Sequence, residues 1–98
     1  MTSVWCEGTF TVGAELGLHA RPAGQFVMLA GRFDARVEVS RADDSEWVDG
    51  TSILSLLSLA AGRGTALRVR ASGPGAARAV EALGRLLEAE GRGQEPAA

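Results

Sequence analysis

Histidine and cysteine are scarce in this sequence, and each occurs once in the 98 residues. Because Cys6 is alone, the chain cannot close a disulfide on itself, which is consistent with a reducing compartment. Its place in an alternating stretch favours an ordinary strand residue over a reactive thiol. Any imidazole chemistry must use His19, because the chain has no second histidine.

Strong net charge and long apolar runs are also missing. The formal net charge is −2, so there is no basic field of the kind that attracts nucleic acid non-specifically. No apolar run approaches the ~18 residues that a membrane span needs, and the first residues lack the basic cluster and apolar segment of a signal peptide. We therefore expect a cytoplasmic protein that neither inserts into membranes nor binds nucleic acid.

The residues that are present indicate one small α+β domain. Apolar residues make up 46% of the chain, enough for a modest core at this length. Alternating and helical periodicities predict strands over 4–12, 35–41, 46–49 and 65–72 and helices over 20–30, 52–60 and 76–90. This order predicts an open-faced two-layer sandwich, in which three helices cover one face of a four-stranded antiparallel sheet. We assign residues 1–90 to this single domain and predict that residues 91–98 form a flexible tail.

The most informative stretch is Gly17-Leu18-His19-Ala20-Arg21-Pro22-Ala23, which places His19 at or just before a helix N-terminus. Proline is favoured in a first helical turn, and the first backbone N–H groups of a helix lack internal partners. Such an end attracts anions, and the guanidinium of Arg21 adds a permanent cation. A neutral imidazole there is suited to accept a phosphoryl group. The alternative is an ordinary cap or surface histidine.

The helix expected over 52–60 is too short to bury all of its apolar side chains. Ser52 or the residue before it can cap this helix, and three apolar residues are expected to face the core: Leu56, Leu59 and Ala60. The others should remain partly exposed, which in a small protein usually marks a docking surface rather than simple core packing. These are Ile53, Leu54 and Leu57.

Two further features carry no chemistry in this interpretation. In the strand over 35–41, Val37 and Val39 should face the core and Ser40 should face outward. Asp43 and Asp44 lie in a polar turn, and no further ligands are spaced around them to suggest a metal site. We therefore expect neither a metal nor a cofactor.

Both motifs are similar to those of a known family. The stretch from Gly17 to Ala23, continuing into Gln25-Phe26-Val27, closely resembles the active-site signature of the HPr family, the histidine-containing phosphocarriers of the bacterial sugar phosphotransferase system. The segment Thr51-Ser52-Ile53-Leu54 resembles the regulatory serine segment of the family, at about the right distance. The resemblance covers about residues 8 to 90 and agrees in length and element order.

The resemblance implies a function for each motif. His19 would accept a phosphoryl group on Nδ1 from enzyme I and pass it to enzyme II A components, without being an enzyme itself. Arg21 would balance the charge of the phosphate, the backbone N–H groups of Ala20 and Arg21 would donate to it, and Pro22 would fix the entry geometry. Ser52 would be the target of an HPr kinase/phosphorylase, or would only cap its helix. A monomer is the expected state.

Two alternatives to the carrier function remain. A regulatory binding module would use the phosphorylation state of His19 or Ser52 to signal carbon or nitrogen status to a kinase, transcription factor or metabolic enzyme. A generic binding domain would carry the histidine incidentally. The sequence also departs from the family at Leu16, where a small polar residue is usual, and at Ala20, where some members have a hydroxyl. The hairpin after the strand over 35–41 looks about two residues longer.

Overall fold

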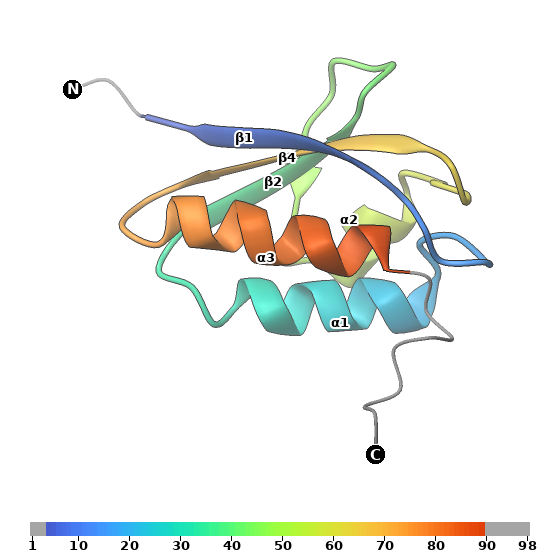
Figure 1. The fold of residues 1–98 in the computed structure, drawn as a ribbon, viewed down its shortest axis with the longest axis horizontal. Coiled ribbons are helices and arrows are strands. Elements are labelled where there is room, and N and C mark those ends of the chain that lie inside the picture. The colour runs from blue at the N-terminus through green and yellow to red at the C-terminus, as the bar shows by residue number, and fades with distance from the viewer. Residues whose placement is uncertain (1–3, 90–98) are drawn as a thin grey trace.

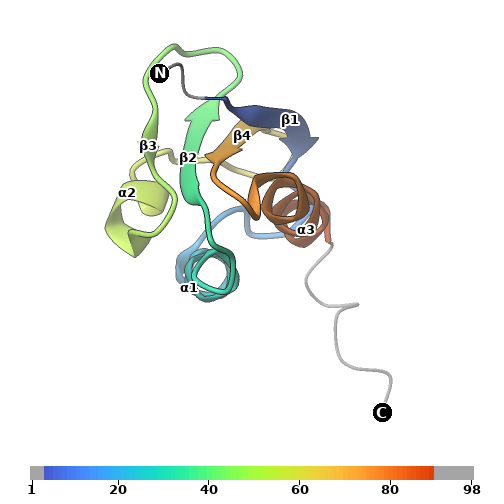
Figure 2. The same ribbon diagram turned by 90° about the vertical axis from the view of Figure 1, so that its left-hand side faces the viewer.

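A computed structural model describes residues 4–89 and shows an α+β sandwich, as the residue pattern predicted. The seven elements follow in the expected order: β1 (Cys6–Thr11), α1 (Ala20–Ala30), β2 (Arg36–Arg41), β3 (Val48–Asp49), α2 (Ile53–Leu57), β4 (Ala66–Ser72) and α3 (Ala76–Glu88). The three helices lie on one side of the sheet and leave its other face open (Figures 1 and 2). The predicted tail, residues 91–98, lies outside the described residues.

The sheet is antiparallel throughout, in the spatial order β1-β4-β2-β3. Its central strand is β4, which pairs with β1 from Cys6 opposite Ala71 and with β2 from Arg36 opposite Ser72. The short β3 extends the sheet at its edge by pairing with β2. The fourth strand in the sequence therefore lies between the first two, which places the loop after β1 and the loop before β4 at the same end of the sheet.

The core lies between the sheet and the helices. On β4, which lies within the strand predicted over 65–72, the inward side chains alternate with outward ones, and Leu67, Val69 and Ala71 are completely buried. The helices contribute Phe26 from α1 and Leu83 from α3, which are also completely buried. Burial of each large apolar side chain stabilises the fold by about 1.5–3 kcal/mol.

Close packing of α3 on β1 depends on a glycine. Gly84 is buried, and a Cβ added there would overlap the ring of Phe10 from β1. The helix can therefore approach the strand closely only because position 84 has no side chain. This contact fixes how α3 covers the first strand.

The open face of the sheet carries a stack of aromatic and guanidinium groups. The guanidinium of Arg70 lies between two indoles, 4.4 Å from the ring centroid of Trp5 and 3.9 Å from that of Trp47, and Arg68 lies 4.7 Å from Trp47. Glu38 accepts from Arg70 at 2.6 Å. Arg70 is thus paired within the open face, which the helices do not cover.

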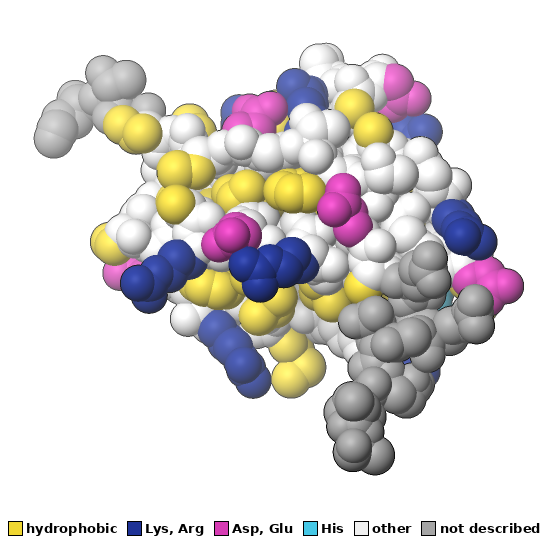
Figure 3. All heavy atoms as spheres, in the orientation of Figure 1, with side chains coloured by type: hydrophobic (Ala, Val, Ile, Leu, Met, Phe, Trp, Pro, Cys, Tyr) yellow, Lys and Arg dark blue, Asp and Glu magenta, His cyan; other side chains and the backbone are white. Residues whose placement is uncertain are grey.

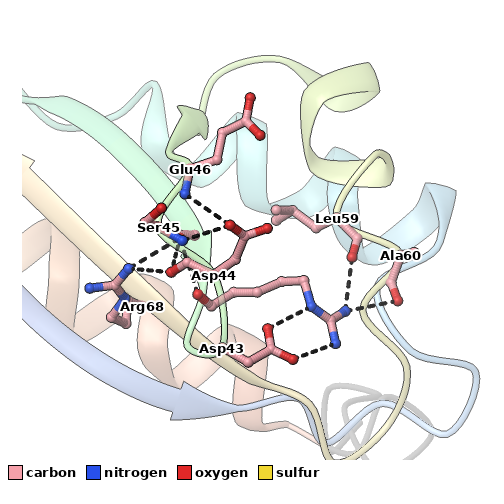
Figure 4. A network of polar contacts seen from close by, with 9 residues as sticks. Asp43, Asp44, Ser45, Glu46, Leu59, Ala60 and Arg68 are labelled. Atoms are coloured by element: carbon pink, nitrogen blue, oxygen red, sulfur yellow. Dashed lines mark hydrogen bonds and ion pairs between the residues drawn. The ribbon is translucent and has the colours of Figure 1, made fainter.

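Ser40 differs from the sequence prediction, because it is completely buried although it belongs to the open face. Its hydroxyl accepts from Nη2 of Arg68 at 3.3 Å and donates to the carbonyl of Arg41 at 3.1 Å. The same Arg68 nitrogen donates to the carbonyl of Asp44 at 2.8 Å, so the β2–β3 hairpin folds over this part of the sheet (Figure 4). The alternation assigned the correct face, but the hairpin covers it.

The second helix is shorter than predicted, and one of its expected core residues was assigned wrongly. Helix α2 ends at Leu57, and Leu56 and Leu59 are buried as expected, but Ala60 is exposed. Ala60 has a left-handed backbone, with a φ of 51°, which turns the chain so that Ala61 enters the core instead. The helical spacing could not reveal this turn, because alanine rarely adopts a positive φ.

Candidate functional site

His19 lies at the N-cap of α1, as the sequence predicted, and the helix bounds agree with the predicted 20–30. Its backbone is extended, with a φ of −92° and a ψ of −168°, and its side chain makes no capping hydrogen bond. The residue is half-exposed rather than packed in the interior. The carbonyl of His19 accepts the first helical hydrogen bond, from the N–H of Ala23 at 2.9 Å.

The first turn of α1 offers two free backbone donors. Among residues 4–89, no acceptor pairs with the N–H of Ala20 or of Arg21, and Pro22 has no N–H. The positive end of the helix dipole lies at the same place, so an anion there would meet both unpaired donors and favourable charge. The Arg21 side chain is exposed and makes no ion pair within the described residues. Position 21 can therefore present a guanidinium next to these amides.

The loop that delivers His19 is held by backbone contacts. Gly17 has a φ of 78°, and a Cβ there would come within 2.6 Å of the carbonyl oxygen of Ala61. That oxygen accepts from the N–H of Leu18 at 2.8 Å, and the Leu18 side chain is buried. The N–H of His19 donates to the carbonyl of Gly17 at 2.9 Å. The loop before His19 is thus held against the segment that follows α2.

Ser52 occupies the N-cap of α2, and its Oγ accepts from the N–H of Ser55 at 3.2 Å. Its neighbour Thr51 donates from both its hydroxyl and its N–H to Asp49, at 2.6 and 2.8 Å. These hydrogen bonds lower the pKa of the Asp49 carboxyl below its usual value. The side chain that caps α2 is thus that of Ser52, whereas Thr51, the other residue that the sequence allowed, binds Asp49 instead.

The expected docking residues are exposed to different degrees. Leu54 has 80% of its surface exposed and Ile53 has 41%, whereas Leu57 is partly buried against the core. Helices α1 and α2 contact each other, and a Cβ on Gly24 of α1 would lie 3.9 Å from Cδ1 of Ile53. The elements that carry His19 and Ser52 are therefore neighbours, although the two residues are far apart in the sequence.

Further apolar side chains are exposed on or beside α1. Leu16, in the loop before α1, is 78% exposed, and Met28, on α1 itself, is 74% exposed. On the side of the molecule that carries α1 and α3, hydrophobic side chains are interspersed with arginines and acidic residues (Figure 3). The exposed apolar surface near α1 is thus bordered by charge, as protein–protein interfaces commonly are.

Comparison with known proteins identifies the family. Residues 6–89 match the family model described as "PTS HPr component phosphorylation site". The chain belongs to the HPr family. The HPr of Haloferax volcanii is 43% identical over 81 residues, which cover 83% of this chain and 91% of that protein.

Two solved structures have the same fold. The HPr of Bacillus anthracis superposes with a TM-score of 0.80 at 33% identity and covers 86% of this chain and 98% of its own. Crh of Bacillus subtilis, described as a catabolite repression HPr, superposes with a TM-score of 0.66 at 34% identity and covers 87% and 99%. Proteins of the HPr family are phosphocarriers of the phosphotransferase system and in general not enzymes.

No metal centre or membrane span appears among the described residues. Within residues 4–89 no group of three or more His, Cys, Asp or Glu side chains could hold a metal ion. Of the helices described there, none is long and apolar enough to cross a membrane. The carboxylates of the Asp43-Asp44 turn are used locally, because Asp43 pairs with Arg41 and Asp44 accepts from the N–H groups of Ser45 and Glu46 (Figure 4).

Sequence reasoning missed the contacts that hold the segment after α2. Arg41 ends the strand predicted over 35–41, next to the polar turn, but its guanidinium donates to the carbonyls of Leu59 and Ala60. No local pattern signals such a contact, since its partners are 18 and 19 residues away. Within the strand predicted over 65–72, Arg68 and Arg70 alternate with apolar residues, which is a signal for the open face but not for the indoles that pack on the two arginines.

Proposed function

We propose that His19 accepts a phosphoryl group from phosphorylated enzyme I and passes it to enzyme II A components of the phosphotransferase system. The observation that carries the proposal is the helix start, where two free N–H groups directly follow His19, a partly exposed residue. The family assignment supplies the class of reaction, and the local geometry supports the residue that performs it.

In the proposed transfer, Nδ1 of a neutral His19 ring attacks the phosphorus of the donor phosphohistidine. The ring proton resides on Nε2, so that the lone pair of Nδ1 is free. A P–N bond forms on His19 as the P–N bond of the donor breaks. The His19 ring keeps its Nε2 proton and takes up the positive charge, and the donor ring, protonated on its other nitrogen, keeps the bonding electron pair and leaves as neutral imidazole. The phosphoryl group keeps three oxygens throughout and needs stabilisation mainly of their charge.

The residues after His19 are suited to stabilise that charge. The free N–H groups of Ala20 and Arg21 donate to the phosphoryl oxygens, and the Arg21 fork approaches from the exposed side. Pro22 keeps the first turn in helical geometry, with its fixed φ, and leaves no further donor to misdirect the group. Each donor is already in place before the phosphoryl group arrives, so little reorganisation is needed.

The test uses phosphoenolpyruvate labelled in its phosphate together with enzyme I. The chain should acquire a label that is labile in acid and stable in base, and the label should disappear in His19→Ala. Arg21→Lys keeps a charge but loses the fork, and should slow labelling by about 10-fold or more. Arg78→Lys, on the exposed surface of α3, is the matched control and should leave the rate unchanged. An unlabelled wild-type chain would refute the carrier function.

We further propose that docking uses the exposed apolar side chains of α2, Ile53 and Leu54, with Leu57 supporting them from its partly buried position. They lie on the helix that contacts α1, so a partner seated there would be close to the helix that begins at the acceptor residue. We also propose a cytoplasmic monomer as the working form, because His19, the free N–H groups and Arg21 lie together at one helix start and need no residue from a second copy. Light scattering combined with size exclusion would test the oligomeric state.

Phosphorylation of Ser52 is a second candidate function, favoured by its position at the N-cap of α2. A phosphate there would benefit from the helix dipole and would not require α2 to unfold. It would add about two negative charges beside Ile53 and Leu54, which would weaken docking to an acidic partner surface. An HPr kinase/phosphorylase with ATP should give an acid-stable label that is lost in Ser52→Ala but kept in Ser58→Ala. Labelling that persists in Ser52→Ala would refute this site.

A further inference from the structure

Arg41 bridges two parts of the chain that are distant in the sequence. Its Nη1 donates to the carbonyls of Leu59 at 3.0 Å and Ala60 at 3.3 Å, just after α2. Its Nε and Nη2 donate to the two carboxylate oxygens of Asp43 at 3.0 and 3.3 Å (Figure 4). The carboxylate therefore holds one edge of the guanidinium while the other edge faces the two carbonyls, a use of the fork that a lysine cannot reproduce.

The segment that Arg41 holds has an unusual backbone. Ala60 is the only residue other than glycine with a positive φ within residues 4–89. This conformation is unfavourable for a residue with a Cβ and persists only where neighbouring contacts impose it. The guanidinium of Arg41 binds the carbonyl before the Ala60 Cα, which belongs to Leu59, and the carbonyl after it, which belongs to Ala60. Arg41 therefore supplies contacts that hold the backbone at the strained position.

The next residue supports the loop that delivers His19. The carbonyl of Ala61 accepts from the N–H of Leu18 at 2.8 Å, and Gly17 packs against the same oxygen. The position of that oxygen depends on the turn at Ala60, because a change in the φ or ψ of Ala60 would move Ala61, which follows it, together with its carbonyl. A continuous series of contacts therefore runs from Arg41 through Ala60 and Ala61 to Leu18, the residue before His19.

We propose that Arg41 is a positioning residue for phosphoryl transfer: it fixes the left-handed turn at Ala60 and thereby the backbone of Leu18 and His19. This inference deepens the proposed carrier function and rests on it. Arg41 does not touch the phosphoryl group. Its effect is on where the acceptor nitrogen lies relative to the free N–H groups of α1, and small errors in such geometry reduce rates strongly.

The experiment compares Arg41→Met, Arg41→Lys and, as a matched control, Arg85→Met. Arg85 also belongs to an exposed ion pair, with Glu81 at 3.1 Å, but it lies on α3 and contacts no carbonyl after α2. The first readout is hydrogen exchange of the Leu18 amide, measured by NMR. The second is the rate of phosphoryl transfer from enzyme I at saturating and at low concentrations of the variant.

In Arg41→Met, the Leu18 amide should exchange about tenfold faster, and the maximal transfer rate should fall several-fold with little change in KM. Arg41→Lys should show a smaller change in both readouts, because an ammonium can still reach one carbonyl. Arg85→Met should match the wild type. Should Arg41→Met fail to fold, the Arg41→Lys readouts decide alone: exchange and maximal rate equal to the wild type would overturn the proposal.

The two proposals fail in different ways. If the wild type takes no label from enzyme I, the carrier function is refuted, yet the Leu18 exchange still shows whether Arg41 holds the loop. If the wild type is labelled and Arg41→Met transfers at the same maximal rate, or its Leu18 amide remains as protected as before, the positioning role is refuted while the carrier function stands.

Discussion

A glycine-to-alanine substitution at position 17 should damage the site more than the same substitution at another left-handed glycine. Gly17 and Gly64 both have a positive φ, 78° and 89°, so alanine is strained at both. At Gly64 an added Cβ would have nothing within 4 Å, whereas at Gly17 it would lie 2.6 Å from the carbonyl oxygen of Ala61. The pair therefore separates backbone strain from a clash.

The expected magnitudes follow from these contacts. The left-handed backbone costs an alanine about 1 kcal/mol at either position. At Gly17 the clash must also displace the Ala61 carbonyl, which breaks its hydrogen bond to Leu18 and leaves a buried polar group unpaired, at a cost of about 1–3 kcal/mol. We expect Gly17→Ala to lower the free energy of unfolding by about 2–4 kcal/mol and Gly64→Ala by about 1 kcal/mol. Any change in unfolded-chain entropy is common to both variants and cancels in the difference between them, which should be about 1–3 kcal/mol.

Urea unfolding and thermal melting measure the stability of both variants, with Gly62→Ala as a neutral reference, since its Cβ would also meet nothing within 4 Å. For a domain of this size, 1 kcal/mol corresponds to a shift in Tm of about 4–8 °C. Transfer from enzyme I should be slowed in Gly17→Ala but not in Gly64→Ala, at a temperature where both are folded. Equal stability and equal rates in the two variants would refute the view that Ala61 supports the acceptor loop.

Three further outcomes are expected. Leu54→Asp should change the free energy of unfolding by no more than about 0.5 kcal/mol, because the side chain is 80% exposed, but should raise the KM of enzyme I for the chain. Val4→Asp is the control, since Val4 is 75% exposed and lies outside α1 and α2, and an equal rise in KM for both variants would exclude a specific docking surface. Trp47→Leu should cost about 1–2 kcal/mol in urea unfolding, because Arg68 and Arg70 both lose a cation–π partner, and no loss would show that the stack contributes nothing. The pKa of Asp49 is lowered in the folded chain, so the ionised carboxylate adds to the free energy of unfolding above its unfolded pKa of about 3.8, and this addition is lost as the pH falls through the lowered value. Asp49→Asn should therefore be less stable than the wild type at pH 7 and similar to it near pH 2, and a difference in stability that does not change with pH would contradict this.

The sequence predicted those parts of the fold that depend on side-chain periodicity. The strand containing Leu67, Val69 and Ala71 and the helix from Ala20 to Ala30 followed from alternation and from helical spacing, because these patterns state directly which face is buried. The turn at Ala60 did not follow, since the guanidinium that contacts the carbonyls there comes from Arg41, 18 and 19 residues away. The burial of Ser40 was missed for the same reason, because the hairpin that covers it is a tertiary feature.

The part of the site that consists of backbone N–H groups could be predicted from the sequence. Free N–H groups follow from the existence of a helix start at Ala20, whatever the side chains are, so a motif that fixes the helix start also fixes the donors. Leu16 is compatible with such a site, because its side chain is 78% exposed and the amides of Ala20 and Arg21 are free without a polar group there. The constraint lies instead at Gly17, where any side chain would push against the carbonyl that holds the loop. Variation should therefore be tolerated at positions 16 and 20, and should impair transfer at position 17.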